Sequence, residues 1–180
     1  MKPVIYQLLP RLFGNYCETR KNNGSRQENG CGHFADITPK ALKAIQDLGA
    51  THVWYTGVIR HATAERNTPE ITKGKAGSPY AITDYYDVDP DLAVDESKRM
   101  AEFEGLIRRT HKAGLKVIMD LVHSHTVKNI REGINLFDGT DTQFFHKGSR
   151  GFHPAWGTRC FDYGKNDVLR FLLSDLRYWM

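Results

Sequence analysis

Short apolar segments alternate along the chain with longer segments in which apolar residues recur at helical spacing. Three apolar segments rich in β-branched and aromatic residues predict strands, over residues 3–10, 51–58 and 115–122. Between and after them, apolar stripes of helical period predict three helices. The stripes consist of Ala41, Leu42, Ile45 and Leu48, then Met100, Phe103, Ile107 and Thr110, and finally Leu169, Leu172, Leu176 and Trp179.

Boundary residues support these helices. Thr38 precedes Pro39, which is the favoured order of an N-cap and a first helical residue, and Gly49 provides a stop. Asp95 or Ser97 can start the second helix, which Gly114 ends, and Asn166 can cap the third.

The order strand, helix, strand, helix, strand, insertion, helix predicts an α/β fold with a parallel sheet. This order does not by itself separate a barrel from an open doubly wound sheet. The third strand is apolar on both faces, so we expect helices to cover both. Residues 60–79 have too many turn formers for a regular element, and residues 126–165 show no sustained period, which indicates a long insertion.

Composition excludes several classes of protein. The 180 residues carry a formal net charge of +4 with scattered Lys and Arg, which gives nucleic-acid binding little support. The longest apolar runs are too short to cross a membrane, and the N-terminus lacks the pattern of a signal peptide. Three cysteines without a CxxC motif favour reduced thiols and a cytoplasmic location.

The candidate chemistry lies in "DLVHSH", residues 120–125, where an acid and two histidines follow the third strand. His123 and His125 can share one face, but a zinc site needs further ligands, and none has a recognisable spacing. Hydrogen-bonded polar residues at a strand end are the plainer interpretation. If the fold is a barrel, however, this end of the strand carries the active site.

Acids and aromatics crowd residues 80–96. Because burial of many like charges is costly, we expect the acids of residues 84–96 to lie in a solvated loop. Tyr80, Tyr85 and Tyr86 can present flat rings to a sugar, or can equally be half-buried packing residues.

Four ordered motifs together carry a family resemblance over essentially the whole chain. They are "VIYQLLPRLFG", "GHFADITPKALKAIQDLGATHVWYTGV", "SPYAITDYYDVDP" and "HKAGLKVIMDLVHSH". In these the chain resembles the front of the α-amylase-type catalytic barrel of glycoside hydrolase family 13. The resemblance implies a partial (β/α)8 TIM barrel. Residues 1–125 would form its first βα units, 126–165 a domain B-like insertion, and 166–180 a helix before the fourth strand.

The same resemblance implies roles for three residues. Tyr80 matches the tyrosine that stacks on the sugar before the scissile bond, and His125 matches the histidine that hydrogen-bonds that sugar. Asp120 matches an acid that organises the strand end. Many amylases have a calcium-ligating Asn at the position of Ser124, so we expect no calcium site, no other metal and no cofactor.

Two subfamilies contribute to the resemblance. Residues 1–115 are similar to a maltodextrin-acting α-amylase, whereas residues 120–180 are similar to 1,4-α-glucan branching enzymes. An α-glucan or maltodextrin substrate is implied by both, with no nucleic-acid or membrane partner. Hydrolysis is favoured slightly, because the amylase-like motifs span more of the chain. Branching and a non-catalytic glucan-binding module are the alternatives, and a metal-binding α/β protein is a remote one.

The family's catalytic groups are an Asp nucleophile, a Glu acid/base and an assisting Asp. No acid of this chain matches any of these positions. The last predicted helix also has no stop signal before Met180. We therefore expect the catalytic carboxylates to lie beyond Met180 and the 180-residue chain to be inactive alone.

Overall fold

The computed structural model describes residues 2–128 and 143–180. The chain forms two compact units, each assembled from two segments. Unit 1 consists of Met1–Val58 and Asp87–Asp120, and unit 2 of Ile59–Tyr86 and Leu121–Met180. No helix among the described residues is long and apolar enough to cross a membrane.

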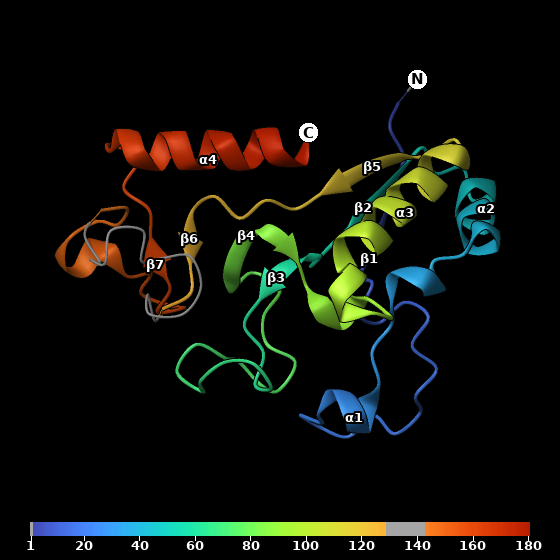
Figure 1. Cartoon of the computed structure of the whole chain (residues 1–180), viewed down its shortest axis with the longest axis horizontal. Helices are drawn as coiled ribbons and strands as arrows, with labels where there is room; N and C mark the ends of the chain where they lie inside the picture. Colours follow the sequence, from blue (N-terminus) through green and yellow to red (C-terminus); the bar gives the residue numbers. More distant parts are fainter. Residues whose placement is uncertain (1, 129–142) are drawn as a thin grey trace. The chain divides into compact units, whose positions relative to one another are not determined.

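A three-stranded parallel sheet forms the centre of unit 1 (Figure 1). Its strands are β1 (Ile5–Leu8), β2 (His52–Tyr55) and β5 (Lys116–Met119), in the order β1-β2-β5. The register aligns Leu8 with Tyr55 and Tyr55 with Met119. The three predicted strands and their parallel arrangement are therefore confirmed.

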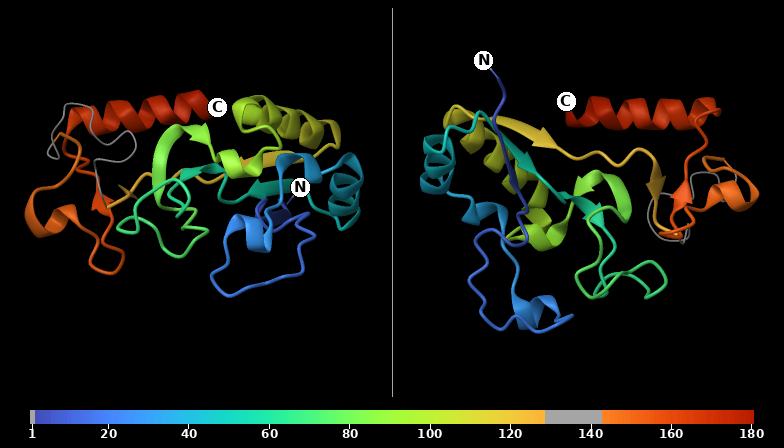
Figure 2. Two further views of the ribbon diagram at one scale, coloured as in Figure 1. Left: turned by 60° about the horizontal axis from the view of Figure 1, so that its bottom comes forward. Right: turned by 180° about the vertical axis from the view of Figure 1, so that it is seen from behind.

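Two helices lie against one face of this sheet, α2 (Pro39–Asp47) and α3 (Arg99–Lys112), as Figures 1 and 2 show. The Tyr55 hydroxyl forms a 2.6 Å hydrogen bond with the Thr110 hydroxyl of α3. Thr38 caps α2 by accepting a hydrogen bond from the backbone N–H of Ala41, as its position before Pro39 predicts. A 3-10 helix precedes each of these helices: Phe34–Asp36 comes before α2 and Glu96–Lys98 before α3.

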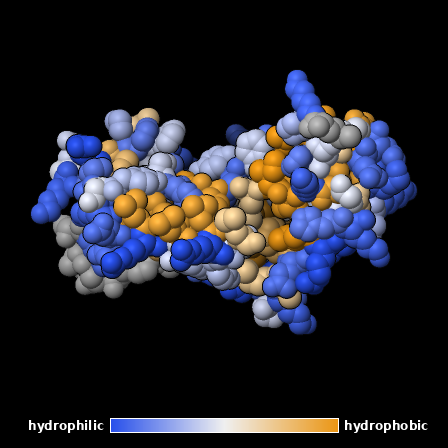
Figure 3. All heavy atoms as spheres, turned by 90° about the horizontal axis from the view of Figure 1, so that it is seen from above, coloured by the Kyte–Doolittle hydropathy of each residue, from blue (hydrophilic) through white to orange (hydrophobic). Residues whose placement is uncertain are grey.

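The opposite face of the sheet differs from the prediction that helices cover both faces. Among the described residues, Val117, Ile118 and Met119 of β5, whose side chains alternate between the two faces, are all only half-buried. Val4 and Ile5 expose about half of their surface, and Figure 3 shows apolar side chains open to solvent near the start of the chain. An apolar strand predicts two apolar neighbours, but the sequence cannot tell whether a given chain provides both.

The acidic segment also differs from the prediction, because it is structured and its central acids are buried. β4 spans Ile82–Val88, a 3-10 helix follows over Pro90–Leu92, and Asp87, Asp89 and Asp91 are only 6%, 0% and 2% exposed. Arginines compensate for the burial. They belong to α3 and to segments far away in the sequence.

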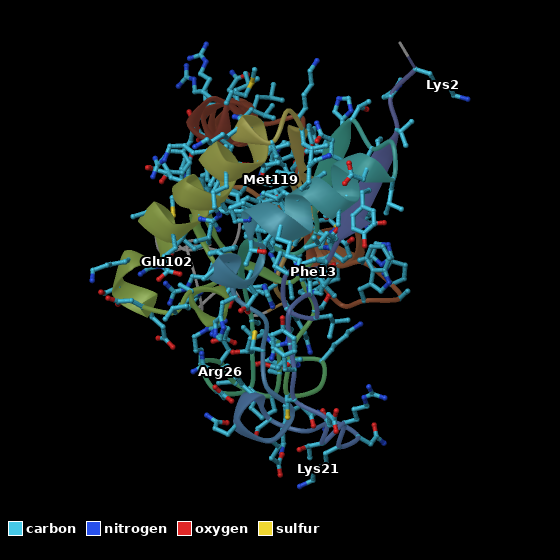
Figure 4. All side chains as sticks on the ribbon, turned by 90° about the vertical axis from the view of Figure 1, so that its right-hand side faces the viewer. Lys2, Phe13, Lys21, Arg26, Glu102 and Met119 are labelled. Atoms are coloured by element: carbon cyan, nitrogen blue, oxygen red, sulfur yellow. The ribbon has the colours of Figure 1, made fainter. Side chains whose placement is uncertain are left out.

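Arg99 holds both carboxylate oxygens of Asp87, through Nε at 2.7 Å and Nη2 at 2.8 Å. Asp91 receives two guanidinium groups, Arg26 at 3.1 Å and Arg11 at 3.4 Å. Arg26 begins the short helix α1 (Arg26–Asn29) and is labelled in Figure 4. Bidentate and doubled pairing of this kind offsets the cost of removing carboxylates from water.

Unit 2 contains short strands and one long helix. β3 (Ile59–His61) forms a two-stranded sheet with β4, and β6 (His125–Thr126) runs antiparallel to β7 (Arg159–Cys160). The expectation of no regular element in residues 60–79 is wrong at its start, because β3 continues to His61. A 3-10 helix covers Gly148–Gly151. Part of the predicted insertion, residues 129–142, lies outside the described residues.

The last helix, α4 (Asn166–Trp179), has a different buried face from the one predicted. Its buried residues are Val168, Phe171, Leu172 and Asp175, whereas Leu169 of the predicted stripe is 41% exposed. Asn166 is the first helical residue and Lys165 precedes it as N-cap without a side-chain bond, so the predicted cap is wrong by one position. The buried face includes Asp175, whose carboxylate lies 3.1 Å from His123. A pattern of apolar residues alone cannot predict that an acid is buried.

The buried pair between Arg99 and Asp87 predicts a measurable loss of stability. Arg99→Ala leaves a buried carboxylate without its main partner and should lower the free energy of unfolding by about 2 kcal/mol. Arg108→Ala, on the same helix, removes an exposed pair with Glu104 and should change it by less than about 0.5 kcal/mol. Urea unfolding of the two variants gives the comparison, and equal losses would contradict a special role for Asp87.

Candidate functional site

Unit 2 contains a pocket of about 510 Å³ that collects two of the three residues predicted from the sequence. Tyr80 and His125 both line it, together with Ser124, Trp156, Lys73 and Lys128. Its base is apolar: Ile71, Ala81 and Val127 line the pocket and are buried with Ala62 in one cluster. A small number of polar groups around an apolar base is typical of sites for small ligands.

A glycine turn positions Tyr80. Gly77 has φ +73°, and a Cβ there would lie 1.8 Å from the carbonyl oxygen of Ala62, so only glycine fits this close approach. Next to it the Ala62 N–H donates to the Ala81 carbonyl at 2.9 Å. The loop is thereby fastened to the end of β3, and the Tyr80 side chain keeps 43% of its surface exposed.

Hydrogen bonds fix the orientation of His125. Its Nδ1 lies 2.7 Å from the Ser124 hydroxyl, and the ring also hydrogen-bonds to the backbone of Tyr80. The backbone carbonyl of His125 accepts from the buried Tyr85 hydroxyl at 2.8 Å. The two residues predicted to bind substrate are thus directly connected, and the Ser124 hydroxyl orients the imidazole.

Burial is the main cause that lowers the pKa of His125, and the proximity of His153 lowers it further. The bond to the Tyr80 backbone acts in the opposite direction. The neutral imidazole is therefore favoured near neutral pH, a form in which one ring nitrogen donates and the other accepts a hydrogen bond.

Asp120, the third predicted residue, belongs to unit 1 and directly follows β5. Its Oδ1 accepts a 2.7 Å hydrogen bond from the Trp54 indole. Its Oδ2 is buried and has no hydrogen-bond partner among residues 2–128 and 143–180. Desolvation raises the pKa of this carboxyl, and the Trp54 bond opposes the rise.

His123, which the sequence places beside His125, serves the packing of unit 2. Its Nε2 lies 3.1 Å from the buried carboxylate of Asp175, and its carbonyl accepts from the Tyr163 hydroxyl at 2.7 Å. In the described part of the chain, no three His, Cys, Asp or Glu side chains gather where they could hold a metal ion. The zinc hypothesis therefore gains no support.

The three tyrosines considered for sugar binding separate into two groups. Tyr85 is buried and packs edge-on against Phe171 at 5.3 Å, and Tyr86 contacts Phe171 and Tyr178. Both are packing residues. Only Tyr80 lines the pocket.

Trp156 is the large aromatic residue of the pocket that the sequence did not indicate. It lies in an aperiodic segment, where hydrophobic periodicity carries no information. The one available signal is local: "HPAWG", residues 153–157, puts an aromatic between turn-forming residues.

The known proteins that this chain is similar to point to one family. The family described as "Alpha amylase, catalytic domain" matches residues 7–157. The 1,4-alpha-glucan-branching enzyme 2-2, chloroplastic/amyloplastic, of Arabidopsis thaliana is 53% identical over 147 residues, 82% of this chain and 16% of that protein. The 1,4-alpha-glucan-branching enzyme of Yarrowia lipolytica is 38% identical over 87% of this chain and 20% of its own length. The chain thus spans about a fifth of these relatives.

Solved structures agree on the fold. An alpha-amylase from Lactobacillus plantarum is 26% identical with a TM-score of 0.70, covering 98% of this chain and 35% of that one. The catalytic module of the glycogen-degrading pneumococcal virulence factor SpuA has a TM-score of 0.75 at 22% identity, over 98% of this chain and 25% of that one. The described sheet and helices are therefore a fragment of a TIM barrel.

The environment of His125 predicts its titration. The pKa of its imidazole should lie below the ordinary histidine value of 6.5, and His153→Ala should raise it, because the neighbouring imidazole that lowers it is removed. His111→Ala, on the exposed end of α3, should leave the midpoint unchanged. Proton NMR titration, with the signal assigned by its loss in His125→Gln, measures this. A midpoint above 6.5, or one that His153→Ala does not raise, would be incompatible with the arrangement.

Proposed function

Because this chain belongs to the alpha-amylase catalytic-domain family, glycoside hydrolase family 13, we propose that its pocket holds a glucose unit of an α-glucan. The reaction would be one of the retaining reactions of that family at an α-1,4-glucosidic bond. The observation that carries the proposal is the direct connection of Tyr80 and His125 in one pocket of unit 2.

The chemistry of these groups suits a sugar. The exposed Tyr80 ring can stack on the apolar C–H face of a pyranose. The His125 imidazole, held by Ser124 and favoured in its neutral form, can hydrogen-bond to sugar hydroxyls. The apolar base of the pocket excludes water beneath the ring.

Asp120 is proposed to organise the C-terminal end of β5, the edge at which α/β barrels carry their active sites. The orphaned Oδ2 supports this proposal, because a buried carboxylate oxygen calls for a further donor. In the same proposal, β1, β2 and β5 are the first three strands of a barrel, and residues 126–165 are a domain B-like insertion between the third strand and α4.

Bond cleavage with retention needs a nucleophile and an acid/base whose carboxyl groups are about 5 Å apart. No acid of the chain matches either position in the family resemblance, and the buried acids Asp87 and Asp91 of unit 1 are paired with arginines. The residues present therefore bind and orient the glucan. We propose that they do not cleave it by themselves.

Transfer to a glucan hydroxyl and transfer to water are the two outcomes for the covalent intermediate. The curated relatives named above are branching enzymes, which favours transfer to a hydroxyl. Hydrolysis is the second candidate and is supported by the Lactobacillus plantarum alpha-amylase. A non-catalytic glucan-binding module is the third, supported by a formed pocket without matching catalytic acids.

For the cellular location, we keep the expectation of the cytoplasm that follows from the cysteines. Cys17, Cys31 and Cys160 are all free thiols. The Arabidopsis relative is described as chloroplastic/amyloplastic.

Binding of maltoheptaose tests the assignment of Tyr80. Tyr80→Ala should weaken binding by roughly 5- to 30-fold, about 1–2 kcal/mol, whereas Tyr80→Phe keeps the ring and should stay within about threefold. Tyr16→Ala removes an exposed ring of unit 1 and serves as the matched control. Isothermal titration calorimetry gives the affinities. Unchanged binding by Tyr80→Ala would remove Tyr80 from the site.

Activity assays test the absence of matching carboxylates. The 180-residue chain incubated with amylose should release no reducing sugar and should leave the iodine colour unchanged. Released reducing sugar would demonstrate hydrolysis, and a colour shift without it would demonstrate branching. Either result would refute the inactivity of the isolated chain.

A further inference from the structure

Trp156 is a large apolar side chain that the structure leaves 52% exposed at the pocket. Other aromatic residues of unit 2, such as Phe152 and Tyr163, are exposed to a similar degree but do not line the pocket. Single exposed apolar residues are common on proteins and carry no meaning alone. Trp156 differs from such residues in how its ring is held and in its place at the pocket.

A closed turn holds the Trp156 backbone. The His153 N–H donates to the Thr158 carbonyl at 2.8 Å, and the Gly157 N–H donates to the His153 carbonyl at 2.8 Å. The Ala155 N–H lies 3.3 Å from His153 Nδ1. Gly157 has φ +66°, a conformation that favours glycine and closes the turn. The position of Trp156 is therefore set before any ligand arrives.

The ring itself is fixed by two imidazoles. His153 stacks on it with 3.9 Å between centroids and 9° between planes, so one face of the indole is occupied. His125 lies 5.3 Å away at 48°. The exposed surface of the indole therefore lies away from the face that His153 covers, and the ring is close to the histidine proposed to hold the sugar.

The other two tryptophans are used differently. Trp54 donates its indole N–H to Asp120, and Trp179 donates its own to the Tyr85 carbonyl. Within residues 2–128 and 143–180, the Trp156 N–H has no hydrogen-bond partner. Trp156 thus lines the pocket with an exposed ring, and within the described part of the chain its N–H is free to donate to a ligand. A sugar ring offers a C–H face to the first and hydroxyls to the second.

We propose that Trp156 is a second stacking platform, which takes the glucose unit next to the one held by Tyr80 and His125. This proposal rests on the proposed function of the pocket. His153 acts as a positioning residue that keeps the indole face in place. A site with two platforms selects for a chain of glucose units over a single glucose, because the second ring contributes only when a second unit is present.

The test compares a single sugar with a chain. Binding of methyl α-glucoside and of maltoheptaose is measured for the wild type, Trp156→Ala, Trp156→Phe and Tyr80→Ala. Trp156→Ala should weaken maltoheptaose binding by roughly 5- to 30-fold and leave methyl α-glucoside binding unchanged. Trp156→Phe should retain maltoheptaose binding within about threefold. Tyr80→Ala should weaken binding of both ligands.

Fluorescence adds a readout that a structural role would not change. Stacking of a sugar on Trp156 should alter tryptophan emission when maltoheptaose is added, and Trp156→Phe should abolish that change, since Trp54 and Trp179 are half-buried and hydrogen-bonded. His153→Ala should reduce both the emission change and the affinity. If Trp156→Ala fails to fold, the single variants His153→Ala and Trp156→Phe still test the proposal.

The outcomes separate the two proposals. If Tyr80→Ala weakens binding while Trp156→Ala does not, Trp156 is no platform and the proposed function stands. If the wild type binds neither ligand, the proposed function fails and the platform fails with it. If Trp156→Ala weakens the binding of methyl α-glucoside and of maltoheptaose equally, the Tyr80 and Trp156 rings contact the same glucose unit. This result would contradict the proposal of a second platform.

Discussion

The burial of Asp87, Asp89 and Asp91 is the constraint on which unit 1 depends. Each carboxylate must be compensated once it leaves water, and the compensation comes from distant parts of the chain. Arg11 after β1, Arg26 of α1 and Arg99 of α3 all reach this segment. The Asp89 N–H also donates to the Val58 carbonyl after β2. One short segment thereby fixes the exits of two strands and the start of a helix.

Ser124 has a comparable importance in unit 2, at a smaller scale. In the family resemblance, many amylases have a calcium-ligating Asn at this position. In this chain the Ser124 hydroxyl contacts the imidazole of His125. A neutral hydroxyl can orient an imidazole without adding charge to a pocket that already contains lysines. In the proposed function, Ser124 therefore supports the histidine that hydrogen-bonds to the sugar.

The sequence predicts what local rules determine and misses what distant partners determine. The strands and the Thr38 cap follow from residues close together in the chain, and they are confirmed. The buried acids are missed because Arg11 is 80 residues from Asp91. The face of α4 is missed because His123 pairs with Asp175, 52 residues away. The motifs identify Tyr80 and His125, but their connection and the exposed Trp156 require coordinates.

The end of β5 is also the point at which the chain leaves unit 1 for the second segment of unit 2. Unit 2 nevertheless combines both sides of that point: the Thr126 hydroxyl donates to the Ile82 carbonyl at 2.8 Å, and Trp179 donates to Tyr85. Both segments line the pocket. Residues 59–86 and the segment after residue 120 therefore depend on each other for the shape of the pocket, although they are far apart in the sequence.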